Sequence, residues 1–254
     1  LKHAYMHLTT YAINKPNPKF VFNKSSEDMD VGHKRSMTSV FKSMQEAGVD
    51  TSLLKEKINA AIVKTIITGR PLIAYMYRLS QPLNLANDMC FQVLGIDILI
   101  DEKAEPYLLE VNHTPSFTAD TPLDKTIKKN LLVDTLVLTN INLESKKTKV
   151  NQIRENNELR AQGHRTKLTP EQRSSIRYQQ TSQRDLYEQG HSKRFTKVYP
   201  SDDAALQAKY QKMVRYADME FDEHIGIKKR VAGFSERVGL AGTSPVRKLK
   251  TKRA

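Results

Sequence analysis

The 254-residue chain has no tryptophan, one cysteine and no long hydrophobic run. A lone Cys90 excludes an intrachain disulfide and indicates a reducing compartment, and we expect its thiol to be inert and buried at the start of a strand. No apolar run approaches the ~20 residues of a membrane-spanning helix, and Leu1-Lys2-His3 does not begin a secretory signal. Because the chain also lacks an initiator methionine, we expect it to be partial.

Acidic residues are far outnumbered by basic residues towards the C-terminus. Residues 141–254 hold 25 Lys and Arg against 13 Asp and Glu, whereas residues 1–140 hold 16 against 15. Hydrophobic residues make up 39% of the chain, so a polar segment must dilute an ordinary core. This asymmetry predicts a basic extension on a near-neutral domain, and a polyanionic partner for that extension.

The order of patterns predicts an α/β (α+β) domain followed by helices. Apolar spacing predicts a strand over 5–13, a helix capped by Asp50 or Thr51 that ends at Gly69 and Pro71, and an amphipathic helix over 124–140 that packs on a sheet. A continuation of the helical layer over residues 72–77 is the alternative for the segment after Pro71. Further helices are expected from Pro170 and over 204–221. The composition divides the chain into residues 1–143, a basic and mostly helical extension over 144–232, and a disordered basic tail over 233–254.

Residues 91–113 carry the strongest local pattern. Two apolar runs, Phe91–Ile100 and Pro106–Val111, flank a short polar segment and predict an antiparallel hairpin. If Ile100 faces Tyr107, Asp97 lies directly opposite Glu110, with their Cβ atoms roughly 4.5–5.5 Å apart. Asn112 then points to the same face as Glu110.

Two carboxylates and an amide oxygen on one face favour a cation. Like charges in an apolar sheet repel each other and lose hydration. All three ligand atoms are hard oxygens, which favours Mg²⁺ over zinc for Asp97, Glu110 and Asn112. The alternative is a hairpin whose two acids simply lie on a solvated face, since a one-residue slip in register would separate them.

Three strings in the first part of the chain resemble the tubulin tyrosine ligase-like family, especially its glutamate-adding members. The strings are Met6–Lys15 (MHLTTYAINK), Gly32–Arg35 (GHKR) and Phe91–Phe117, which holds GIDILID and LEVNHTPSF. Their order and spacing match over roughly residues 1–143. Looser similarity continues through Gly163–Glu171 and Val198–Pro200, in the region that polyglutamylases use as a cationic microtubule-binding extension.

The resemblance implies that residues 1–143 are the C-terminal part of an ATP-grasp ligase domain that uses ATP and Mg²⁺. It implies a reaction in which ATP activates a side-chain carboxylate of a tubulin tail as an acyl phosphate, and free L-glutamate attacks to form an isopeptide bond. The lobes that hold adenine and phosphates in the family are not in this sequence. We therefore expect the chain alone to be inactive.

Matching positions imply roles for single residues. Asp97, Glu110 and Asn112 match the metal ligands, and Thr9 and Thr10 match the pair beside the nucleotide, although the family has asparagine where Thr10 stands. Tyr11, Ala12 and Lys34 match contacts to the incoming amino acid. His113 and Lys34 are the candidate catalytic residues, and Lys15 and Arg35 are weaker candidates.

Several alternatives remain at this stage. The chain is expected to be a monomer that binds tubulin or microtubules in the cytoplasm and cytoskeleton, including a cilium, an axoneme or a basal body. A noncatalytic microtubule-binding protein and a glycine ligase of the same family are the alternatives. Nucleic acid would also suit the charge, but aromatic residues are too sparse among the basic ones to favour it.

Overall fold

A computed structural model describes most of the chain. The described residues are 5, 10–25, 30–81, 84, 89–141 and 169–226, with 147, 150, 151, 154, 155, 157–159, 161 and 162. Thr9 and the expected tail over 233–254 lie outside them. The elements in order are α2 (Tyr11–Asn14), α3 (Met37–Glu46), α4 (Thr51–Ser80), β1 (Gly95–Ile100), β2 (Pro106–Asn112), α5 (Pro122–Leu138), α7 (Pro170–His191) and α8 (Ala204–His224).

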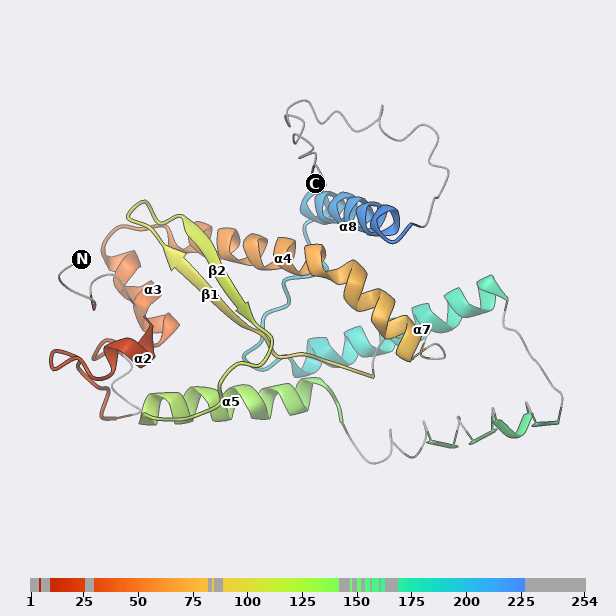
Figure 1. Ribbon diagram of the computed structural model, residues 1–254, viewed down its shortest axis with the longest axis horizontal. Coiled ribbons are helices and arrows are strands. Elements are labelled where there is room, and N and C mark those ends of the chain that lie inside the picture. The colour runs from red at the N-terminus through yellow and green to blue at the C-terminus, as the bar shows by residue number, and fades with distance from the viewer. Residues whose placement is uncertain are drawn as a thin grey trace, which may run out of the picture.

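The described part is a mixed α and β structure with one small antiparallel sheet, β1 and β2 (Figure 1). Helix α4 contacts α3, β2 and α8, while α5 packs mainly against α7. The expected packing of α5 on the sheet is not among these larger contacts of the described residues. In the described residues no helix has the length and apolar character needed to span a bilayer.

Helix α4 is longer than its sequence predicts. Asp50 caps its start as expected, with its carboxylate accepting hydrogen bonds from the backbone N–H groups of Ser52 and Leu53, both at 3.0 Å. Pro71 does not end the helix but lies buried inside it. Pro71 has no N–H to donate, and Figure 1 shows the bend that such a loss produces in a helix. Tertiary burial of Pro71 accompanies this departure from the local preference.

A cluster of buried apolar residues in the described part of the chain joins α4 to α8. Val63 and Ile67 of α4 and Tyr210 of α8 are each at most 4% exposed, and four half-buried residues pack around them: Val198, Met213, Val214 and Ala217. An ion pair between Arg70 and Asp218, 2.7 Å long, borders the cluster. The helix expected over 204–221 is thus confirmed, and it is docked on the first part of the chain.

Two short segments differ from the sequence expectation. Residues 11–13, expected as the end of a strand, lie instead in the short helix α2. Cys90, expected in the core, is exposed and precedes β1. In both places a local apolar pattern has no neighbouring strand to pair with among the described residues.

We expect Ile67→Ala to destabilise the protein by about 2–5 kcal/mol, since it leaves a cavity between α4 and α8. Ile73→Ala makes the same change on the same helix at a side chain 68% exposed, and should shift stability by no more than about 0.5 kcal/mol. Urea unfolding of both variants measures the difference. Equal losses would show that α8 does not cover Ile67 in solution.

Candidate functional site

The hairpin places the predicted acidic residues together. Asp97 pairs with Glu110 and Gly95 pairs with Asn112, so these side chains share one face. The pairing of Asp97 with Glu110 is as predicted, but that of Ile100 with Tyr107 is not. Ile100 faces Pro106 and the register skips Leu109, which is an extra residue in β2.

Gly95 makes room at this end of the hairpin. A Cβ atom at Gly95 would lie 3.1 Å from the Cβ of Pro115 and 3.5 Å from that of Asn112. A side chain there would crowd both residues. Glycine therefore lets the chain beyond β2 fold back against the strand pair beside the amide of Asn112.

Asp97 and Glu110 interact strongly with each other. Burial, a hydrogen bond shared with Glu110 and the charge of Glu110 raise the pKa of Asp97. The amide of Asn112 donates to Glu110 Oε1 at 2.9 Å, and this bond, followed by the one to Asp97, lowers the pKa of Glu110. Ionisation of Asp97 beside the ionised Glu110 is thus disfavoured, as expected for two carboxylates that face each other.

The donor set fits a hard divalent cation. Asp97 and Glu110 supply carboxylate oxygens, and Asn112 supplies an amide oxygen once its side chain turns from Glu110. Among the described residues no group of three or more His, Cys, Asp or Glu side chains lies where it could hold a metal ion. Any metal at the hairpin therefore depends on two carboxylates and other oxygen ligands, and the assignment to Mg²⁺ stays a prediction.

The second predicted cluster forms around Tyr11 and Lys34. The ammonium group of Lys34 lies 4.3 Å from the centre of the Tyr11 ring, a cation–π contact. Ala12 follows in α2 with an exposed side chain, and Thr10 is the N-cap residue of this helix without a side-chain cap bond. The structure therefore brings Tyr11 and Lys34 together. Among the described residues, the side chain of Thr10 has no such contact with either of them.

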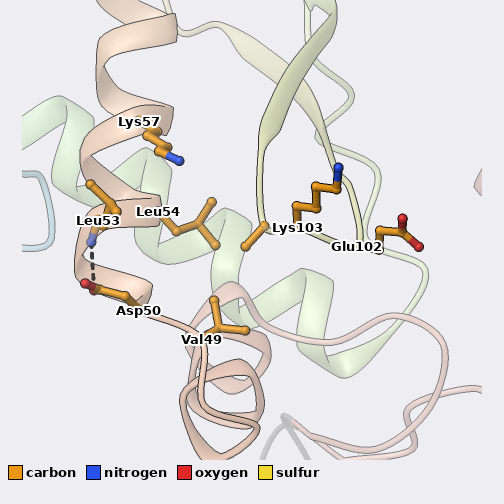
Figure 2. A pocket seen from close by; sticks show the side chains of 8 residues that line it. Val49, Asp50, Leu53, Leu54, Lys57, Glu102 and Lys103 are labelled. Atoms are coloured by element: carbon orange, nitrogen blue, oxygen red, sulfur yellow. Dashed lines mark hydrogen bonds between the residues drawn. The ribbon is translucent and has the colours of Figure 1, made fainter.

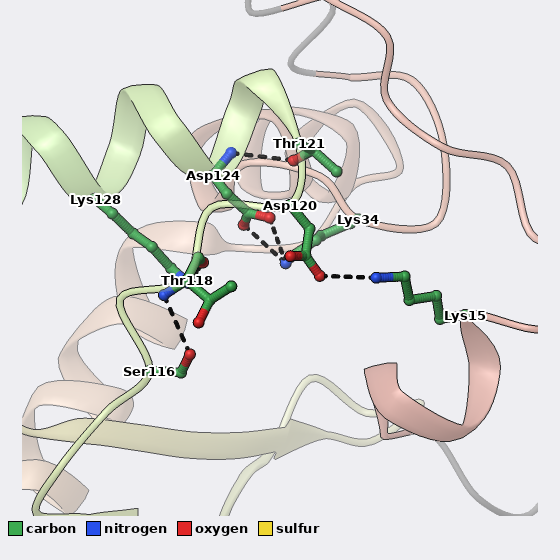
Figure 3. A network of polar contacts seen from close by, with 8 residues as sticks. All are labelled: Lys15, Lys34, Ser116, Thr118, Asp120, Thr121, Asp124 and Lys128. Atoms are coloured by element: carbon green, nitrogen blue, oxygen red, sulfur yellow. Dashed lines mark hydrogen bonds and ion pairs between the residues drawn. The ribbon is translucent and has the colours of Figure 1, made fainter.

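Lysine 34 also makes a contact that the sequence did not reveal. Its ammonium lies 2.7 Å and 2.9 Å from the two carboxylate oxygens of Asp124 in α5 (Figure 3). Four residues earlier, Asp120 pairs with Lys15 at 3.1 Å. In the sequence, Thr121-Pro122 before Asp124 indicates the capped start of a helix. It does not indicate that Asp124 pairs with a distant lysine.

The residues around Lys34 hold its backbone in place. Gly32 has a φ of +93°, and a Cβ atom there would lie 2.7 Å from the Val21 carbonyl oxygen, so only glycine fits. His33 stacks on Phe20, with ring centres 5.0 Å apart. Arg35 donates to Ser43 Oγ at 2.6 Å and also pairs with Asp30. The conformation of Gly32–Arg35 is thus fixed on both sides of Lys34.

His113 and the two clusters are separate features in the described structure. His113 follows Asn112 with an exposed side chain, and its backbone carbonyl accepts a hydrogen bond from Gln92. The polar contacts found for Asp97, Glu110 and Asn112 are with one another, whereas those of Lys34 run to α2 and α5. The segment 113–121 joins the two covalently.

A pocket of about 260 Å³ lies elsewhere, between the start of α4 and the turn of the hairpin (Figure 2). Its lining consists of residues from these two segments: Val49, Asp50, Leu53, Leu54, Lys57, Glu102, Lys103 and Ala104. None of the predicted site residues lines it. The acidic face of the hairpin is an open surface instead.

Comparison with known proteins gives the chain a family. The model of the tubulin-tyrosine ligase family matches residues 1–149. A probable beta-tubulin polyglutamylase of Tetrahymena thermophila is 42% identical over 89% of the chain, and tubulin polyglutamylases named ttll6 of Danio rerio and TTLL6 of Homo sapiens are 35% and 33% identical over 91% and 89% of it. The chain covers 19%, 29% and 24% of the length of these relatives, respectively.

We expect Glu110→Gln to lower the pKa of Asp97 towards its usual value, with the effect of burial left in place. Because its pKa is raised in the folded protein, protonated Asp97 stabilises the fold at acid pH, and this contribution is lost as the pH rises through that pKa. The free energy of unfolding of Glu110→Gln should therefore fall less over the same rise in pH. Carboxyl ¹³C NMR titration measures the pKa. Glu102→Gln in the turn is the control, and an unchanged pKa in Glu110→Gln would contradict the shared hydrogen bond.

Proposed function

Because the chain belongs to the tubulin-tyrosine ligase family, we propose that the whole protein is an ATP-dependent tubulin polyglutamylase. The names of its relatives support glutamate addition to tubulin. The observation that carries the proposal is the pairing of Asp97 with Glu110 beside Asn112. In this proposal, residues 1–143 are the C-terminal part of an ATP-grasp domain, and residues 144–232 and 233–254 are the extension and tail.

The proposed reaction joins the amine of free glutamate to a side-chain carboxyl group of a tubulin tail. ATP transfers its terminal phosphoryl group to that carboxylate, the amine nitrogen attacks the activated carbon, and phosphate leaves as the isopeptide bond forms. Asp97, Glu110 and Asn112 would hold Mg²⁺, which when bound neutralises charge on the phosphoryl oxygens. Thr9 and Thr10 would lie beside the nucleotide.

The residues of this chain would position the amino acid. Lys34 offers a cation to a carboxylate of glutamate, and the Tyr11 ring and Ala12 border it. The contact between Lys34 and the Tyr11 ring supports one binding site for the amino acid. His113, directly after the acidic hairpin, would orient the acceptor side chain. Holding the two reactants in one geometry supplies much of the rate increase in such reactions.

The extension would bring the protein to its substrate. Tubulin tails are acidic, and the excess of basic residues lies in the second part of the chain. However, α7 and α8 together hold 6 basic and 7 acidic residues, whereas residues 225–254 hold 9 and 1. We therefore assign the attraction mainly to residues 141–169 and 225–254. We place the protein in the cytoplasm on the cytoskeleton, including axonemes, as a monomer.

The test of the proposed function is mass spectrometry of tubulin incubated with the full-length protein, ATP and either glutamate or glycine. We expect glutamate masses on the tails. Asp97→Asn should reduce incorporation by more than ~100-fold, because even residues that only support a metal ligand contribute ~10–100-fold. Glu102→Gln, on the same hairpin, should leave the rate unchanged. Added glycine masses, or no loss in Asp97→Asn, would contradict the proposal.

Removing residues 228–254 should weaken microtubule binding by roughly tenfold or more, since this segment carries nine basic residues and one acidic residue. Cosedimentation with microtubules at increasing salt measures it, and binding should fall as salt screens the charges. A variant with the same residues of the segment in scrambled order should bind as the unchanged protein does. Loss of binding in the scrambled variant would contradict a role of charge alone.

A further inference from the structure

Helix α5 carries a buried acidic residue near its start, where its carboxylate has little contact with bulk solvent. Asp124 lies in the first turn and is 6% exposed. Thr121 caps the helix by accepting a hydrogen bond from the Asp124 N–H at 3.1 Å. A buried carboxylate loses hydration and needs a partner charge. Burial would raise the pKa of Asp124, but the hydrogen bond and charge of Lys34 and the bond to Thr121 outweigh it and lower that pKa.

The partner charge comes from Lys34, 90 residues away in sequence. Both oxygens of Asp124 lie within 2.9 Å of the ammonium nitrogen, and the Tyr11 ring lies on another side of it at 4.3 Å. An ammonium group has three N–H donors, and two carboxylate oxygens use at most two of them. The side chain of Lys34 is 35% exposed, so its remaining donor can reach a ligand.

Stability alone is a poor reason for such a pair. A buried ion pair recovers little more than the hydration its charges lose, and apolar residues of similar size often do as well. What the pair supplies is a fixed orientation of the Lys34 ammonium group. The four-carbon stem of a lysine is flexible, and a carboxylate held at a helix start by its own cap fixes the ammonium against one face of an aromatic ring.

We propose that Asp124 is the positioning residue of Lys34: from the first turn of α5 it holds the lysine ammonium against the Tyr11 ring, so that Lys34 presents an N–H to the carboxylate of the incoming amino acid. The inference rests on the proposed function, in which Lys34 binds that amino acid. Asp124 does not touch the substrate and acts only through Lys34.

The paired charges also affect which ligands suit the site. Lys34 with Asp124 carries no net charge, as does Lys15 with Asp120 nearby. The two pairs add no net charge, and Lys128, whose charge also lowers the pKa of Asp124, supplies a positive field nearby. Lys34 therefore contributes to the affinity for a carboxylate through a well-directed N–H. A loosely held Lys34 would lose that direction while keeping its charge.

Steady-state kinetics of the full-length protein with tubulin, ATP and glutamate test this role. Asp124→Asn should raise the KM for glutamate about tenfold, with kcat and the KM for ATP within about twofold of the unchanged protein. Lys34→Met should raise the KM for glutamate at least as much. The double variant should be no worse than Lys34→Met, because Asp124 acts through the lysine.

Asp134→Asn is the matched control. Asp134 lies on the same helix, is 4% exposed and pairs with Arg194 through both oxygens at 3.0 and 2.9 Å. It should cost similar stability and leave the KM for glutamate unchanged. If Asp124→Asn does not fold, Asp124→Glu, which keeps the charge but moves the carboxylate, should still raise this KM.

The outcomes separate the two proposals. A raised KM in Lys34→Met without one in the Asp124 variants overturns the positioning role alone. Additive effects in the double variant, or a lower kcat at unchanged KM as a purely structural residue would give, also overturn it. An unchanged KM in Lys34→Met overturns the amino-acid site at Lys34, and the role of Asp124 with it.

Discussion

The structure depends on burial along one helix. Helix α4 packs against α3, against strand β2 of the hairpin and against α8, and its contact with α8 contains Val63, Ile67 and Tyr210. Apolar burial is the largest favourable term in folding, and few side chains of the described part are fully buried. The placement of the acidic hairpin therefore follows from the helix that its second strand touches.

The acidic face was predictable because its pattern is local. Two apolar runs around a short polar segment predict the hairpin, and the pairing of Asp97 with Glu110 is as predicted because the extra residue Leu109 offsets the one-residue error at Ile100. The extra residue Leu109 could not be predicted, since nothing in the sequence distinguishes it from its neighbours. The strand expected over 5–13 was wrong at residues 11–13, which lie in α2. Pro71 was expected to end a helix, but α4 continues through it to Ser80.

Other features needed tertiary structure. The partner of Lys34 lies 90 residues along the chain, and an aspartate near a helix start is ordinary in sequence. The family resemblance singled out Lys34 and Tyr11, but the structure alone adds Asp124. The charge shows the reverse case: composition assigns the excess of basic residues to residues 141–254 as a whole, while the helix bounds show that α7 and α8 within it are nearly neutral.

The face that holds Asp97 and Glu110 also carries large apolar side chains. Leu99 and Tyr107, paired with each other on that face, are 51% and 52% exposed. Anything that covers this face removes water from around the acids and lowers the local dielectric constant, which strengthens their attraction for a cation in inverse proportion. Covering the face and binding a cation are therefore thermodynamically linked, and each changes the affinity for the other by the same factor.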